Sequence, residues 1–204
     1  MRLIKFIILF FILFGCSQKE VSIDTSFNLP KEKRHITQET LQFDLTVGYD
    51  KNVNVYRVRK NLMLMLKEFE EEINVKFNIL DEKHVIISTK ETNEMFAHCA
   101  LQLNPSKRES DKHLHLCFIN SEVKIFSDDF IAIGGYMSIL GAALIGDYKD
   151  DFQNMNTIKH EIGHFLGAGH TRYGIMQPGL SEYQYFRVFK FSLESIQEIR
   201  EKQK

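Results

Sequence analysis

The chain has 204 residues, which is enough for one domain with appended segments. Apolar residues make up 44% of it, a share that suits a globular core. The formal net charge of −1 provides no electrostatic basis for nucleic-acid binding, so that class of partner is excluded.

The N-terminus has the pattern of an export signal over residues 1–15. Arg2 and Lys5 precede an unbroken apolar run at residues 6–14, which is too short to span a bilayer as a mature helix. The Leu-Phe-Gly-Cys sequence that ends at Cys16 resembles a bacterial lipobox, in which the cysteine is lipid-modified and becomes the new N-terminus. We therefore expect an exported protein held at a bacterial membrane by lipid on Cys16. A soluble secreted form or an uncleaved anchor is the alternative.

Residues 16–40 are expected to comprise the lipidated cysteine and a flexible polar tether. Few apolar residues occur between Ser17 and Gln38, and Pro30 falls within this stretch. Such a composition buries too little apolar surface to fold alone. The folded domain is therefore expected over residues 41–204.

Apolar periodicity predicts the first elements of this domain. Apolar and polar side chains alternate over residues 41–49, which is the pattern of a half-buried strand. An apolar stripe at three- and four-residue intervals predicts a long helix over residues 54–74. Short strands are predicted at residues 75–80, 84–89 and 113–120.

The second half of the domain is expected to add a strand and two helices. Residues 134–146 are rich in glycine and apolar residues and are predicted to end in an edge strand around residues 142–145. A helix follows, with Asn156 or Thr157 as its expected N-cap. Ser192 is predicted to cap the final helix.

The helix that follows the strand at residues 142–145 carries the pattern H-E-x-x-H-x-x-G-x-x-H, from His160 to His170. His160 and His164 are four residues apart, so their rings share one helical face and can bind one metal ion. Zinc binds imidazole nitrogen and, in catalytic sites, keeps its fourth position for water. Glu161 lies roughly 100° round the helix from His160, where it can take a proton from that water. Gly167 can end the helix in the left-handed conformation, so that His170 returns as the third ligand.

These residues and the methionine that follows resemble the metzincin signature. The segment from Tyr173 to Pro178 looks like the Met-turn of the matrixins, in which the methionine forms an apolar floor under the zinc site. Astacin- and serralysin-type metzincins carry a tyrosine ligand where Pro178 stands, which favours the matrixin branch. The matching residues are His160, Glu161, His164, Gly167, His170 and Met176.

This resemblance implies an α+β fold, a metzincin-type catalytic domain. Its expected parts are a twisted mixed sheet, a long N-terminal helix, a zinc-binding active-site helix, the Met-turn and a C-terminal helix. It also implies a zinc-dependent endopeptidase that holds an extended protein or peptide substrate against an edge strand. Zn²⁺ is the expected cofactor and a monomer the expected state.

Two other hypotheses remain open at this stage. A surface lipoprotein could bind host or envelope proteins through its edge strand with little or no catalysis. Glu161 argues against it, because a binding scaffold has no physical need for a base beside the metal. The other hypothesis keeps the chemistry and changes the substrate to cell-wall peptides or one dedicated envelope protein.

Two cysteines remain once Cys16 is set aside. In an exported protein this even remainder predicts a disulfide between Cys99 and Cys117, with two free buried thiols as the alternative. His113 and His115 alternate with Cys117 on one strand face and, with His98, could form a second metal site. A surface or disulfide-lined face is the favoured interpretation.

Three more features have plainer explanations. Asp147, Asp150 and Asp151 could help to bind Ca²⁺, but no set of six to eight oxygen ligands is evident, so solvated acidic surface is expected. Asp24 could reach the zinc as an inhibitory carboxylate, although a solvated linker is the simpler expectation. The aromatic residues between positions 183 and 191 are expected mostly to pack as wall and core, with some rings shaping a specificity pocket.

Overall fold

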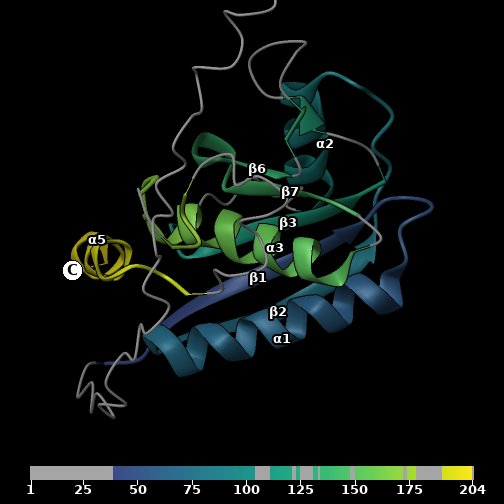
Figure 1. The fold of residues 1–204 in the computed structure, drawn as a ribbon. Coiled ribbons are helices and arrows are strands. Elements are labelled where there is room, and N and C mark those ends of the chain that lie inside the picture. Colours follow the sequence, from purple (N-terminus) through teal and green to yellow (C-terminus); the bar gives the residue numbers. More distant parts are fainter. Residues whose placement is uncertain are drawn as a thin grey trace, which may run out of the picture. The chain divides into compact units, whose positions relative to one another are not determined.

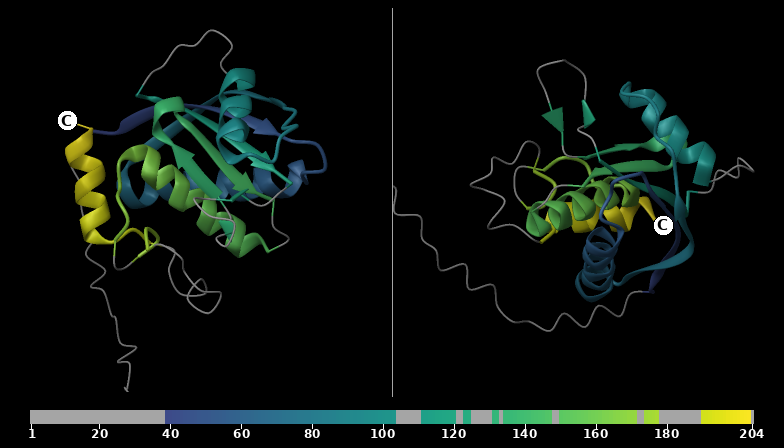
Figure 2. Two further views of the ribbon diagram at one scale, coloured as in Figure 1. Left: turned by 90° about the horizontal axis from the view of Figure 1, so that it is seen from above. Right: turned by 90° about the vertical axis from the view of Figure 1, so that its right-hand side faces the viewer.

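A five-stranded mixed sheet with helices on both faces forms the folded unit, Ile36–Lys204 (Figure 1). The computed structural model describes residues 39–103, 111–120, 123–124, 131–132, 134–147, 150–171, 174–177 and 190–203. Helices α1 (Val55–Ile73) and α3 (Asp151–Leu166) pack on one face of the sheet, and α2 (Thr92–Leu103) packs on the other (Figure 2). The α+β architecture and the mixed sheet that were expected are confirmed.

The sheet has the strand order β2-β1-β3-β7-β6. β1 (Leu41–Tyr49) is parallel to β2 (Val75–His84) on one side and to β3 (His113–Ile119) on the other. β7 (Ala142–Gly146) continues the parallel arrangement beside β3, and β6 (Gly134–Met137) is antiparallel to β7. β6 is therefore an edge strand of the sheet, and its first residue, Gly134, packs against α3.

The predicted edge strand is wrong in its position. The expected strand is present as β7, but it lies inside the sheet because the segment before it contains a second strand, β6. The chain reverses between them through a 3₁₀ turn, η1 (Ser138–Leu140), and Gly141, whose φ of 55° is in the left-handed region. A separate pair of short strands, β4 (Val123–Lys124) and β5 (Ile131–Ala132), lies earlier in the chain.

The alternation of β1 and the stripe of α1 build the larger core. Every second residue of β1 from Phe43 to Tyr49 is buried on the face covered by α1 and α3. The helix expected over residues 54–74 is confirmed as α1. The Asn54 side chain accepts from the N–H of Arg57 at its start, and Asn74 ends it at φ 54°.

The two strands predicted after α1 are a single strand, β2, and residues 85–89 form no strand. The N–H of Val85 still donates to the Tyr49 carbonyl of β1, but side chains satisfy the backbone of the next two residues. Gln102 donates to the carbonyl of Ile86 at 2.8 Å and accepts from its N–H at 2.9 Å. The Asp50 carboxylate accepts from the N–H of Ile87. These partners are distant in sequence, so periodicity could not reveal them.

Helix α2 was not predicted, although its buried residues follow helical spacing. Met95, Phe96, Cys99 and Leu103 face the second core, which lies on the opposite side of the sheet from α1. Cys99 forms a disulfide with Cys117 of β3, and this bond joins α2 to the sheet.

Removing the disulfide should destabilise the fold measurably. Cys99 and Cys117 are 18 residues apart, and closing a loop of that size stabilises a folded protein by about 3 kcal/mol. We expect a Cys99→Ala, Cys117→Ala double variant to lose about that free energy of unfolding, measured by urea denaturation. Adding a reductant should destabilise the wild-type protein and leave the double variant unchanged. Equal stability of the two proteins without reductant would contradict this expectation.

Helix α3 begins earlier than expected, because Asp150 caps it. The Asp150 side chain accepts from the N–H of Gln153 at 2.9 Å. Asn156 and Thr157, the expected caps, lie inside the helix, where Thr157 donates to the carbonyl of Gln153. The apolar repeat begins only after the first turn, which hid that turn from the sequence pattern.

The chain ends in helix α5 (Leu193–Lys202), and the prediction that Ser192 caps it is confirmed. The Ser192 side chain accepts from the N–H of Ser195 at 3.1 Å. None of the helices in the described ranges has both the length and the apolar content needed to cross a membrane.

Candidate metal centre

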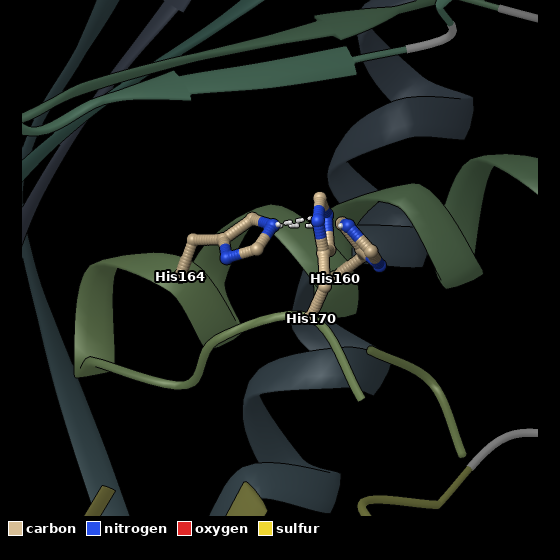
Figure 3. Close-up of side chains that lie close together, drawn as sticks. All are labelled: His160, His164 and His170. Carbon is tan, nitrogen blue, oxygen red and sulfur yellow. Dashed lines mark hydrogen bonds between the residues drawn. The ribbon is translucent and has the colours of Figure 1, made fainter. Parts of the chain in front are cut away.

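Three imidazoles converge at the C-terminal end of α3 (Figure 3). His160 and His164 lie one turn apart on α3, and His170 lies on the segment that follows the helix. The Nε2 atom of His164 is 3.1 Å from the Nε2 atoms of both His160 and His170. Within the described ranges, these histidines are the one group of three or more His, Cys, Asp or Glu side chains that could hold a metal ion.

The spacing of these nitrogens fits a tetrahedral zinc ion. Zinc binds imidazole nitrogen at about 2.0–2.1 Å, so tetrahedral ligand atoms are roughly 3.3 Å apart. The distances of 3.1 Å approach this value. Three imidazole ligands would leave the fourth tetrahedral position to water, as a catalytic zinc site requires. The residues present therefore fit zinc.

Backbone carbonyls orient two of the rings. A carbonyl can only accept, so His160 Nδ1 donates to the carbonyl of Ile175 at 2.7 Å, and His164 Nδ1 donates to that of Ala168 at 2.9 Å. In each neutral ring the proton is then on Nδ1, and Nε2 is free to bind metal. Burial lowers the pKa of His160 to about 4 and also lowers the pKa of His164, which favours the neutral, metal-binding form.

The chain reaches His170 because α3 ends at Gly167. Gly167 has a φ of 109°, and its N–H bonds to the carbonyls of Gly163 and His164. A side chain here would be strained by this φ and would also collide with Lys202 of α5. The left-handed turn sends the chain back toward the helix face that carries the other two ligands.

Glu161 is buried on α3, directly after His160 in the chain. Its side chain is 6% exposed, and burial raises its pKa to about 8. It lies under the edge strand, where a Cβ on Gly134 would come 3.1 Å from Glu161 Cγ. Close packing of β6 on α3 therefore places Glu161, the residue after the first histidine, under the edge strand.

A tight turn at residues 174–177 carries Met176 beneath the site. The N–H of Gln177 bonds to the carbonyl of Gly174, and that of Thr171 bonds to the carbonyl of Met176. Met176 is fully buried, and a Cβ on Gly163 would lie 2.5 Å from its sulfur. Hydrogen is thus the only side chain at position 163 that leaves Met176 in place.

A buried lysine beside the first ligand was missed at the sequence level. Lys159 is fully buried on α3, and its Nζ lies 3.0 Å from Glu68 and 2.5 Å from Glu72 of α1. Glu72 also accepts from the N–H of Phe191, whose ring lies against Gly163. The sequence shows a lysine between Ile158 and His160, but it does not show that this lysine is buried, because its partners lie some ninety residues away.

The less favoured second metal site is not supported by the described residues. Cys117 is bonded to Cys99, and His115 Nδ1 lies 2.7 Å from the hydroxyl of Thr46. The rings of His113 and His115 are close, with centroids 4.6 Å apart, but no third ligand joins them within the described ranges. Burial lowers the pKa of His115 to about 4, as expected for a neutral histidine in a core.

The three aspartates considered for calcium have other partners. Asp147 pairs with Arg57 and accepts from the N–H of Asn54. Asp151 pairs with Arg57 and accepts from Asn61, while Asp150 caps α3. These contacts join the first turns of α1 and α3. The structure therefore gives no support to a calcium site here.

Several predicted residues lie outside the described ranges. They are Cys16 and Asp24 in the first segment, Tyr173 and Pro178 beside the turn, and the aromatic residues at positions 183–189. The predictions made for them stay predictions.

The fold has known counterparts among solved structures. The chain is similar to an archaemetzincin from Methanopyrus kandleri, with 14% identity, a TM-score of 0.57, and coverage of 81% of this chain and 97% of that one. It is also similar to metalloproteinase-II from Bacteroides fragilis, with 17% identity, a TM-score of 0.54 and coverage of 80% of this chain. The chain spans 54% of that second protein's length.

No protein-family model matches the chain, and no curated protein matches it. Identities of 14% and 17% establish the fold alone. The described domain thus shares its fold with these two proteins, and three histidines gather at the end of its helix α3.

Proposed function

We propose that the protein is a zinc-dependent endopeptidase. The observation that carries this proposal is the convergence of three Nε2 atoms at the end of a helix that also buries Glu161, the residue after the first histidine. The metallopeptidase fold supports it independently of the motif. A metal site that served binding alone would have no use for a buried acid at this position, because burial of an unpaired carboxyl group costs stability.

His160, His164 and His170 would hold the metal through Nε2. When bound, zinc acts as a Lewis acid that polarises the scissile carbonyl and lowers the pKa of water. The positive charge of bound zinc would favour the ionised form of Glu161 and oppose the effect of burial on its pKa. The Glu161 carboxylate would then accept a proton from the attacking water and pass it to the leaving amine. Met176 and Phe191 pack under Gly163 and keep the ligand-bearing turn of α3 in place.

The substrate would lie extended along β6. This strand is the edge of the sheet, so no other described strand pairs with its outer side. Its first residue, Gly134, packs against Glu161, so a peptide paired with β6 would pass the proton acceptor. Strand pairing binds backbone groups and needs no chain terminus, which favours cleavage at internal bonds.

The closer assignment is a matrixin-like metzincin. Its support is the turn that buries Met176 below the histidines, together with Gly167 at the end of α3. Pro178, which favours this branch over the astacin and serralysin types, supports it from the sequence alone.

We also propose that the protein is exported and anchored by lipid on Cys16. The apolar run and the lipobox-like sequence support this. Cells grown with labelled palmitate should label the wild-type protein, and a Cys16→Ala variant should stay unlabelled. Equal labelling of both proteins would reject Cys16 as the lipidation site.

Peptides blocked at both ends test the endopeptidase proposal. Zinc-loaded protein should cut peptides that carry an N-terminal acetyl and a C-terminal amide group, because the site needs no free terminus. Removing the metal should abolish cleavage, and added Zn²⁺ should restore it. A zinc-loaded protein that trims only unblocked peptides would show an exopeptidase instead.

A further inference from the structure

Helix α5 lies antiparallel to the segment that carries the third histidine. Ser195, Glu198 and Lys202 occupy one face of the helix at spacings of three and four residues. Lys202 packs against Gly167, Glu198 accepts from the N–H of Gly169, and Ser195 lies 3.4 Å from the Thr171 hydroxyl. Gln203 extends the series by donating to the carbonyl of Leu166.

The peptide group between Ala168 and Gly169 forms hydrogen bonds through both its carbonyl and its N–H. The carbonyl of Ala168 accepts from His164 Nδ1 at 2.9 Å. The N–H of the same peptide belongs to Gly169 and donates to Glu198 Oε2 at 2.9 Å. Glu198 and His164 are therefore joined through a single peptide plane, and the next residue is His170.

We propose that Glu198 is a positioning residue for two metal ligands, His164 and His170. This inference rests on the proposed zinc site. A carboxylate that accepts from the N–H of a peptide makes the carbonyl at its other end a stronger acceptor. A stronger acceptor holds the His164 ring more firmly and makes its Nε2 more basic toward metal. The same bond fixes the backbone immediately before His170.

The C-terminal helix is itself well anchored, so it can act as a rigid support. Ser192 caps its first turn, and two of its own residues, Ser195 and Ile199, are buried. Arg200 donates to the carbonyl of Ile73 at the end of α1. Glu198 is thus held on an element that is fixed to the rest of the domain without the metal.

Two variants with side chains of similar size test whether Glu198 acts through its hydrogen-bond acceptor or through its volume. Glu198→Gln keeps an oxygen acceptor, and Glu198→Leu removes it. Glu201→Leu is the matched control, because Glu201 lies exposed on the same helix and its side chain bonds only to Gln197 among the described residues. Zinc affinity of the full chain is measured by competition with a coloured chelator, and thermal unfolding is measured on the zinc-free proteins.

We expect Glu198→Leu to weaken zinc binding about tenfold, the lower end of the range for residues that support a ligand. Glu198→Gln should restore most of that affinity, and Glu201→Leu should match the wild type. All four zinc-free proteins should unfold at similar temperatures, because the bond acts on the metal ligands.

Each other outcome overturns the proposal. Wild-type zinc affinity in Glu198→Leu would show that the bond does not position the ligands. A Glu198→Leu protein that fails to fold without zinc would assign Glu198 to the fold. A wild-type protein that binds no zinc would reject the zinc site itself, whereas the first two outcomes leave the proposed function intact.

Discussion

Replacing Glu161 by glutamine should lower peptide hydrolysis by about a thousandfold while leaving zinc bound. General acid–base groups contribute on the order of 10²–10⁴-fold to catalysis, and glutamine cannot accept the proton. Glutamine has nearly the same volume as glutamate, so the packing of this position under Gly134 is kept. Turnover of a peptide substrate and zinc content per chain are the two measurements.

The control for this variant is Glu194→Gln, which alters an exposed carboxylate on α5. It should keep both activity and zinc. Loss of zinc from Glu161→Gln would contradict the role assigned to Glu161, because a residue that only moves a proton is not needed to hold the metal.

Replacing His164 by alanine should release the metal and with it much of the protein's stability. His164 is central to the site, since its Nε2 lies 3.1 Å from both other Nε2 atoms. Its loss also leaves the Ala168 carbonyl without its ring partner. We expect zinc affinity to fall by more than about a hundredfold, beyond the range for residues that only support a ligand.

Zinc-dependent stability provides a direct measurement of this effect. A ligand present at a thousand times its dissociation constant stabilises the folded state by about 4 kcal/mol. Wild-type protein should therefore melt at a higher temperature with zinc than without, and His164→Ala should show no such rise. His84→Ala, which removes an exposed histidine at the end of β2, should behave as the wild type. Full zinc stoichiometry in His164→Ala would overturn the ligand set.

The sequence was most informative where contacts are local. The spacing of His160 and His164 sets their shared face, and glycine at position 167 ends the helix, because both effects act within one or two turns. The stripe of α1 and the alternation of β1 were readable for the same reason. In each case the residues that determine the structure are neighbours in the chain.

Three of the errors fall where distant residues decide the structure. The edge strand was misplaced because pairing of β6 with β7 is a tertiary contact that periodicity does not record. Backbone groups of Ile86 and Ile87 are satisfied by Gln102 and Asp50, so a strand-like segment forms no strand. Glu198 had no sequence signal, because its partner is a backbone N–H 29 residues away.

Cleavage of a diverse peptide library tests the central claim most directly. The purified protein is incubated with the library with and without a zinc chelator, and the products are identified by mass spectrometry. The proposal predicts internal cuts that disappear with the chelator and return when Zn²⁺ is added in excess. Absence of internal cuts from folded, zinc-loaded protein, or cuts that persist in the chelator, would contradict it.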